Sequence, residues 1–279
     1  MGELIHTFEA DTCPQAWLDA VEYLNEQKDR SAYNVVLGIA TPEAMTAADF
    51  AVFDRVDALL RKHDREPLTT VAGTIFPASF YLQEGATGVY ETYPELHPKV
   101  KSLWGNYAMR MLRKSKMPKP GEKEAQMNPL KVLVEKMKTQ LEHARMRGVY
   151  EISAVEIDDL LEMPIYDAAL DCKRTRCHPC LSHLSFKLLA DDRVMLTALY
   201  RYHYYIEKAL GNLIGLSQLL CFVAKETELR PGPLVCHSTL ARIDKDAGWS
   251  AHEVEAVIAQ CRQAETASEL VGGRCQAPS

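Results

Sequence analysis

The chain reads R-C-H-P-C-L-S-H-L-S-F from Arg176 to Phe186 and T-A-L-Y-R-Y-H-Y-Y-I-E-K-A-L-G-N-L-I-G-L-S-Q-L-L from Thr197 to Leu220. Leucine and phenylalanine alternate with polar residues in the first segment, and the start of the second is rich in tyrosine; both patterns are typical of half-buried strands. The residues Ala190-Asp191-Asp192 between them are a turn signal. The sequence therefore predicts a β-hairpin, with strands at 180–189 and 193–202.

The hairpin brings a thiol and a guanidinium toward one another. If Asp191 and Asp192 are its two loop residues, Cys180 pairs with His203 and Ser182 with Arg201. Diagonal neighbours on a sheet lie within reach of long side chains, so Cys180 and Arg201 would be close. Because a nearby cation lowers the pKa of a thiol, Cys180 is a candidate nucleophile. A structural cysteine buried on a strand fits the same spacing.

Strands and helices interleave along the rest of the chain, without repeats. We predict helices at Pro14–Lys28, Ala47–His63, Pro98–Met117, Pro129–Met146, Leu210–Thr227 and Ala251–Ala264, and strands at Tyr33–Ala40, Thr69–Phe76, Gly148–Val155 and Leu234–Ile243. The Lys-, Pro- and Gly-rich segment Pro118–Asn128 is expected to be an exposed loop. The order of elements indicates an α/β or α+β fold with a mixed sheet, formed by residues 1–279 as one domain.

Composition narrows the function classes. The chain has 279 residues and a formal net charge of -6, which argues against a surface that coats a nucleic acid polymer. It shows no signal-peptide pattern and no window near the ~18 apolar residues that span a bilayer. Eight cysteines in a chain of this length, with no sign of export, predict reduced thiols and a cytoplasmic protein.

Several motifs together resemble the thymidylate synthase family, nearest its archaeal-type branch and the pyrimidine nucleotide hydroxymethylases. They are P-C-L at Pro179–Leu181, A-L-Y-R at Ala198–Arg201, G-N-L-I-G-L-S-Q-L-L at Gly211–Leu220 and R-P-G-P-L-V at Arg230–Val235. The resemblance covers residues 145–244, whereas residues 1–128 are divergent; W-G-N-Y-A-M-R-M at Trp104–Met111 is compared with the family's Y-G-x-x-W-R. The resemblance implies a thymidylate-synthase-like mixed sheet flanked by helices, in a sheet-to-sheet homodimer.

The resemblance also implies a role for individual residues. Cys180 would add to C6 of a pyrimidine nucleoside monophosphate, and Arg201 and Ser238 would bind its phosphate. Arg147 would reach the phosphate in the neighbouring subunit. Asn212 would contact the base, because an amide can donate to O4 and accept from N3–H of uracil. The expected activity is one-carbon transfer to C5, as methylation or hydroxymethylation, with methylenetetrahydrofolate as the family's donor.

The sequence departs from the family pattern at three places. The serine after the phosphate arginine is Tyr202, and the folate-contacting aspartate is Tyr204. The His-x-Tyr that holds the sugar hydroxyl is replaced by Arg242-Ile243-Asp244. His203 is a candidate general base or pocket residue beside the two tyrosines, and a structural histidine fits the same position.

Two other readings use the same residues. A zinc site could use Cys172, Cys177, His178, Cys180, Cys236 and His237. However, the sequence has no second close pair at C-x2-C spacing, and the flanking strand pattern suits a sheet better than a zinc knuckle, so we expect no metal. The departures at Tyr202, Tyr204 and Asp244 also fit a non-catalytic nucleotide-binding paralogue that acts as a sensor or partner subunit.

Overall fold

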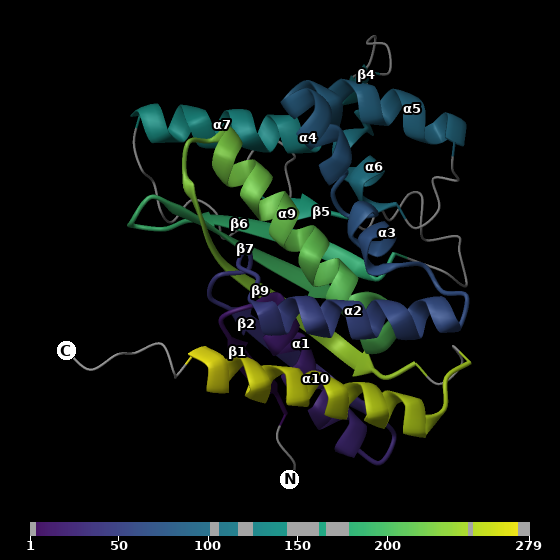
Figure 1. Cartoon of the computed structure of the whole chain (residues 1–279). Coiled ribbons are helices and arrows are strands. Elements are labelled where there is room, and N and C mark those ends of the chain that lie inside the picture. The colour runs from purple at the N-terminus through teal and green to yellow at the C-terminus, as the bar shows by residue number, and fades with distance from the viewer. Residues whose placement is uncertain are drawn as a thin grey trace, which may run out of the picture.

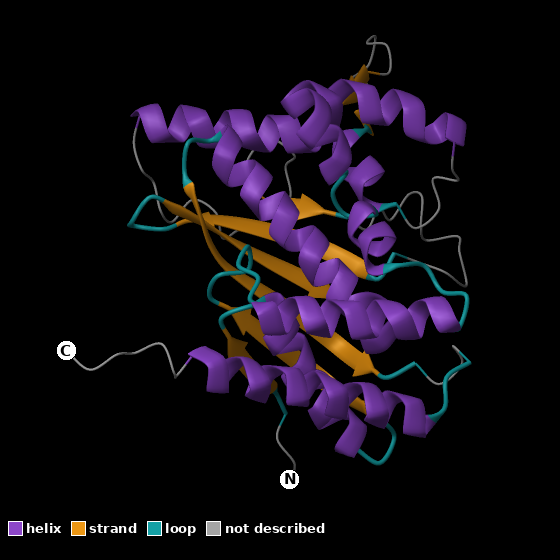
Figure 2. Ribbon diagram, in the orientation of Figure 1, coloured by secondary structure: helices purple, strands orange, loops and turns teal. Residues whose placement is uncertain are grey.

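The chain forms a mixed β-sheet covered by helices (Figures 1 and 2). The computed structural model describes residues 4–100, 106–116, 125–143, 162–165, 179–244 and 248–272. The main sheet has the order β1-β2-β9-β7-β6-β5, and β8 pairs with β9 beside this path. Its strands are β1 (His6–Ala10), β2 (Ser31–Ile39), β5 (Glu162–Pro164), β6 (Leu181–Leu188), β7 (Arg193–Tyr200), β8 (His203–Tyr204) and β9 (Arg230–Arg242). A separate small hairpin is formed by β3 (Lys114–Lys116) and β4 (Ala125–Met127).

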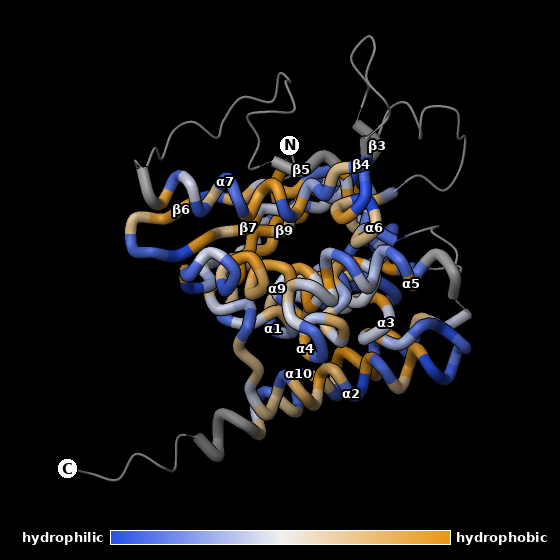
Figure 3. The backbone as a smooth tube through the Cα atoms, turned by 90° about the horizontal axis from the view of Figure 1, so that it is seen from above, coloured by the Kyte–Doolittle hydropathy of each residue, from blue (hydrophilic) through white to orange (hydrophobic). Residues whose placement is uncertain are grey.

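Helices α1 and α9 pack on the sheet, and α2 and α10 lie in front of them (Figure 1). The described helices are α1 (Cys13–Glu26), α2 (Ala47–Lys62), α3 (Leu68–Gly73), α4 (Ala78–Thr87), α5 (Tyr93–Val100), α6 (Tyr107–Leu112), α7 (Pro129–His143), α9 (Leu210–Glu226) and α10 (Ala251–Gly272), with π-helical turns η1 (Gly88–Thr92) and η3 (Tyr205–Ala209). The indole of Trp17 on α1 donates to the carbonyl of Tyr205 at 2.6 Å, which joins α1 to the turn that begins α9. The strands β6, β7 and β9 and the helix α9 form the most hydrophobic part of the molecule (Figure 3).

The fold class expected from the sequence is confirmed as a mixed sheet flanked by helices. The hairpin and the helices near residues 14–28, 47–63, 129–146, 210–227 and 251–264 are present, with ends that differ by a few residues. Helix α10 is longer than expected and begins with a capping arrangement, in which Ser250 and Glu253 each accept the other's backbone N–H. Strand β1, which pairs in parallel with β2, was not expected.

The predicted strand Thr69–Phe76 is wrong, because these residues begin in helix α3. The backbone N–H of Leu68 donates to Asp57 Oδ1 at 2.9 Å, which satisfies a free donor at the helix start. The helix then packs against α9 where Gly211 and Gly215 allow a close approach. Tertiary contact thus overrides the strand preference of the β-branched residues.

The region after residue 98 also differs from expectation. The predicted helix Pro98–Met117 is divided, because α5 ends at Val100 and α6 at Leu112, and β3 follows. The expected loop at 118–128 includes strand β4. The predicted strand Gly148–Val155 lies outside the described residues.

The predicted register of the hairpin is off by one residue. Leu184 pairs with Ala198, and a bulge brings Leu181 opposite Tyr200. The connection has three residues, and its last, Asp192, has φ of 59°. A three-residue hairpin loop that ends in the left-handed region is a common alternative to the two-residue turn.

One segment, Tyr205–Glu226, is long and apolar enough to cross a membrane by composition. However, 72% of its most apolar window is buried inside the fold. It is accordingly the central helix of the core, as in a soluble α+β protein.

We predict that Gly215→Ala destabilises the fold by about 1–3 kcal/mol in urea unfolding. A Cβ at this position would lie 2.6 Å from the carbonyl oxygen of Ala72, so α3 and α9 must separate. Gly73→Ala is the matched control, because a Cβ there meets open space. Equal stability of the two variants would contradict the close approach.

Candidate functional site

Cys180 and Arg201 meet at one end of the hairpin. Cys180 directly precedes β6, Arg201 directly follows β7, and the N–H of Arg201 donates to the carbonyl of Cys180 at 3.0 Å. Thr239 of β9 fixes the same point, because its hydroxyl donates to the carbonyl of Arg201 at 2.8 Å. The Cys180 side chain is half-buried against the core. The two residues are therefore neighbours through the backbone, although the predicted pairing was different.

Tyr107, which was not among the predicted site residues, holds the cysteine from the other side. Its hydroxyl accepts the backbone N–H of Cys180 at 3.2 Å and that of Leu181 at 3.5 Å. Burial, and then the proximity of Cys180, raise the pKa of Tyr107 to about 12. The phenol is thus protonated at neutral pH and keeps its own O–H as a donor next to the thiol.

The position of Tyr107 follows from the start of helix α6. Asn106 caps this helix, since its Oδ1 accepts the N–H of Met109 at 3.0 Å. The Asn106 amide also donates to the hydroxyl of Tyr93 at 2.6 Å and lies 2.8 Å from His97 Nε2. The signal in the sequence was the segment W-G-N-Y-A-M-R-M, of which residues 106–111 are described.

His203 joins two of the predicted binding residues in a buried network. Its Nδ1 lies 3.0 Å from Ser238 Oγ, and its Nε2 lies 3.0 Å from Asn212 Nδ2. The hydroxyl of Tyr205 lies 3.4 Å from the same Ser238 oxygen. The ring of Tyr200 stacks on the imidazole at a centroid distance of 4.0 Å. Asn212, Ser238 and His203 thus lie close together beneath the sheet end.

The surroundings of His203 keep it neutral. The residue is 1% exposed, and burial lowers its pKa to about 3. Both ring nitrogens are within hydrogen-bond distance of neutral partners, which fits one protonated and one unprotonated nitrogen. In this conformation His203 orders Asn212 and Ser238, and its low pKa does not suit it to accept a proton at neutral pH.

The two tyrosines that replace family residues form an aromatic pair beside the end of β9. The rings of Tyr202 and Tyr204 meet edge to face at 4.9 Å, and Arg242 Nη1 donates to the Tyr202 hydroxyl at 3.5 Å. Tyr204 is 37% exposed. Burial, followed by its contact with Tyr202, raises the pKa of Tyr204 to about 12, so its phenol is uncharged at neutral pH.

Several residues that the sequence predicted for the site take no part in the contacts described above. Arg147 lies outside the described residues, as do Cys172, Cys177 and His178 of the zinc reading. Cys236 is fully buried, and His237 lies 3.2 Å from Asn34 Oδ1. Among the described residues no group of His, Cys, Asp and Glu has a metal-binding arrangement.

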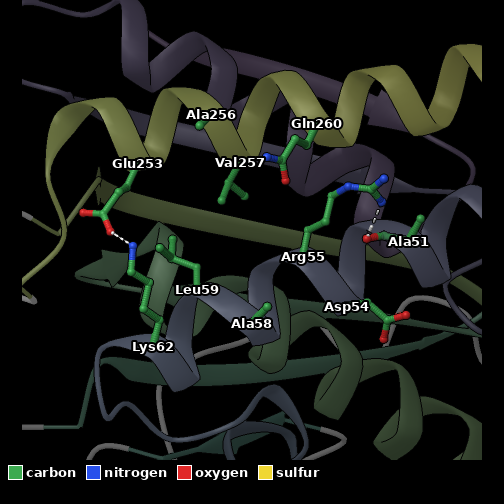
Figure 4. Close-up of a pocket in the computed structure, with 10 residues that line it drawn as sticks. All are labelled: Ala51, Asp54, Arg55, Ala58, Leu59, Lys62, Glu253, Ala256, Val257 and Gln260. Carbon is green, nitrogen blue, oxygen red and sulfur yellow. Dashed lines mark hydrogen bonds and ion pairs between the residues drawn. The ribbon is translucent and has the colours of Figure 1, made fainter.

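A cleft between α2 and α10, with a volume of about 600 Å³, contains none of the predicted residues (Figure 4). Lys62 and Glu253 form an ion pair of 2.7 Å at one end of it. Arg55 bonds back to the carbonyl of Ala51 on its own helix at 2.9 Å. The polar groups of the cleft therefore serve mainly to join or cap the two helices.

Comparison with known proteins gives one partial similarity. No protein-family model matches the chain. A segment of 80 residues is 39% identical to the protein named "Putative thymidylate synthase" of Methanococcoides burtonii. The match covers 29% of this chain and 35% of that protein. The similarity supports a relationship to thymidylate synthases for part of the chain and does not reach its full length.

We predict that His203 makes stability fall as the pH is lowered. Its pKa is about 3 in the folded protein and near 6.5 when unfolded, so only the unfolded chain takes up the proton between these values. The expected loss is about 1.4 kcal/mol per pH unit below 6.5. His203→Gln should flatten this slope in urea unfolding at several pH values, and the half-buried His237→Gln should keep it. A wild-type slope in His203→Gln would show that His203 is not enclosed.

Proposed function

We propose that the protein is a thymidylate-synthase-like enzyme that activates C5 of a pyrimidine nucleoside monophosphate for one-carbon transfer, by methylation or hydroxymethylation. The observation that carries the proposal is the backbone hydrogen bond between Cys180 and Arg201, which brings the proposed nucleophile and the proposed phosphate-binding residue to the same sheet end. The partial similarity to the Methanococcoides burtonii protein supports the same family.

In the proposed reaction the Cys180 thiolate attacks C6 of the ring. The C5–C6 π electrons move toward C5 and O4, so C5 becomes an enolate-like carbon nucleophile. Exchange of the C5 proton with water and expulsion of the thiolate from C6 would restore the ring. Binding of the phosphate by Arg201 fixes C6 within reach of the sulfur, which removes much of the entropic barrier to addition.

The remaining residues position these groups. Tyr107 holds the Cys180 backbone and presents a protonated phenol beside the thiol. Among the described residues, the amide of Asn212 is engaged only by His203, so a second N–H and the carbonyl are left for a base edge. The hydroxyl of Ser238 is enclosed by His203 and Tyr205, and a phosphate would reach it only if these contacts open.

The residues present do not fit the family's folate contact. In the family, the pterin of the folate pairs with the carboxylate of an aspartate, which is an anionic acceptor. Tyr204, at that position in this chain, has an uncharged phenol whose ring packs edge to face against Tyr202. The proposed steps are therefore limited to attack at C6 and activation of C5, which need no folate.

The proposal includes a symmetric homodimer formed through the sheet. On the described residues, α1 and α9 pack on one sheet face, and the side chains of the other face are half-buried. A row across four strands of that face pairs Val36, His237, Leu199 and His183. A half-buried surface of this mixed character suits an isologous contact, in which Arg147 of each subunit would complete the other's phosphate site.

The cellular location in this proposal is the cytoplasm. The five cysteines that the structure describes are free thiols, as a reducing compartment would keep them.

We predict that the protein releases tritium from C5-labelled UMP, dUMP, CMP or dCMP, and that Cys180→Ala lowers this release by roughly 10³-fold or more. Cys221→Ala, which removes a half-buried thiol on α9, should release tritium at the wild-type rate. Each nucleotide is assayed with and without methylenetetrahydrofolate. Tight nucleotide binding without exchange would contradict the enzymatic proposal and favour a nucleotide sensor.

The homodimer is tested by placing a charge on the sheet face that α1 and α9 do not cover. Leu199→Arg should weaken association by at least about 2 kcal/mol, because a contact through this face would bury an unpaired charge. Light scattering after size-exclusion chromatography measures the oligomeric state. Leu82→Arg on α4, where the side chain is 86% exposed, is the control. A wild-type protein that is monomeric at every concentration, or a Leu199→Arg protein that dimerises normally, would contradict the proposed interface.

A further inference from the structure

A second cavity lies where β9 ends and α10 begins. Of the positions compared with the family's nucleotide contacts, Asp244, which stands where the family has a sugar contact, lines it, whereas Cys180, Arg201, Asn212 and Ser238 do not. The volume of the cavity is about 400 Å³. It opens between the connection from α1 to β2 and the connection from β9 to α10. The described residues that line it are Lys28, Arg30, Ile243, Asp244, Trp249, Ser250 and Ala251.

Asp244 is the buried acidic residue among those that line this cavity. Asp244 is 4% exposed, and its Oδ2 accepts the backbone N–H of Glu207 at 2.8 Å. The other oxygen, Oδ1, is buried, and no group that the structure describes donates to it. A buried acceptor without a donor is destabilising, and a ligand with an O–H or N–H group would supply the missing donor. Burial raises the pKa of Asp244 to about 7.

Hydrogen bonds join the described residues of the wall to one another. The indole N–H of Trp249 donates to the backbone carbonyl of Asp244 at 2.8 Å, and Trp249 is itself buried. The N–H of Ile243 donates to the carbonyl of Arg30 at 2.9 Å, which joins the two connections. The cavity is thus built from segments that are far apart in the sequence and are fastened by backbone bonds.

The rim carries positive charge. Lys28 is exposed, and its ammonium group makes no ion pair with a described residue. Arg30 has a side chain 20% exposed and is paired with Glu255 at 3.0 Å, on the outer surface where Glu255 is 53% exposed. An anionic group at the rim would gain from both cations, and exposed Glu255 is a weak competitor because solvent screens it.

We propose that this cavity is a binding site for a small molecule that carries a phosphate or carboxylate together with a hydroxyl or amino donor. The donor bonds to Asp244 Oδ1, and the anionic group lies between Lys28 and Arg30. The volume is within the range of small-ligand pockets. The site stands whether or not Cys180 acts on a pyrimidine.

Isothermal titration calorimetry of the full chain tests the site with three probes. Ribose 5-phosphate carries an anion and hydroxyl donors, glycine carries an anion and an ammonium donor, and inorganic phosphate carries the anion alone. One of the first two should bind at least about tenfold more tightly than inorganic phosphate, and its identity separates hydroxyl from amino recognition.

Two variants assign the contacts. Asp244→Asn should weaken the two-group ligand by about tenfold and leave inorganic phosphate unchanged, because Asn keeps the bond to Glu207 and loses the carboxylate. Lys28→Gln should weaken both, and Lys138→Gln on the exposed face of α7 should weaken neither. Circular dichroism confirms that each variant is folded.

Three outcomes would overturn the proposal. The first is that neither ribose 5-phosphate nor glycine binds, and the second is that binding is insensitive to both Asp244→Asn and Lys28→Gln. The third is that UMP displaces the ligand and Asp244→Asn abolishes UMP binding. The last result would make the cavity part of the nucleotide site. Loss of tritium exchange in Cys180→Ala has no bearing on any of these outcomes, so the two proposals fail separately.

Discussion

The backbone hydrogen bond from Arg201 to Cys180 is the contact on which the proposed function depends. It forms only because β6 and β7 pair as a hairpin and because a bulge at the start of β6 shifts the pairing by one residue. Without that bulge, the two side chains would be displaced along the strands relative to each other. Thr239 of β9 and Tyr107 of α6 fix the two ends of this contact from separate elements. The backbones of Cys180 and Arg201, the proposed nucleophile and phosphate-binding residue, are thus held side by side.

Near this contact, the side chain of His203 lies within hydrogen-bond distance of the side chains of Ser238 and Asn212. His203 remains neutral because it is enclosed, and as a neutral ring it can connect Ser238 with Asn212. The arrangement has a consequence for catalysis, since a histidine with a pKa near 3 cannot serve as a proton acceptor at neutral pH. The phenol of Tyr107 stays protonated at neutral pH, because burial raises its pKa to about 12, and it accepts the backbone N–H of Cys180. The position of Cys180 thus depends on α6 more than on His203.

The sequence predicted the elements with strong periodicity and missed features set by tertiary contact. Helix α9 and the hairpin were clear because their apolar residues repeat at helical and strand spacing. The strand expected at Thr69–Phe76 failed because Asp57 and the glycines of α9 stabilise a helix there. The predicted register of the β6–β7 hairpin was wrong because Asp192 adopts a left-handed backbone conformation, which composition does not reveal. Cys180 and Arg201 were proposed from motif order, whereas the contact of Tyr107 with Cys180 became visible only once α6 was placed.

A crystal structure of the protein with UMP or dUMP bound tests the central claim most directly. The account predicts that the pyrimidine C6 lies within contact distance of the Cys180 sulfur and that the Arg201 guanidinium bonds to the phosphate of the same nucleotide. A nucleotide bound elsewhere, or a Cys180 side chain turned into the apolar core with Arg201 directed away from the phosphate, would contradict it.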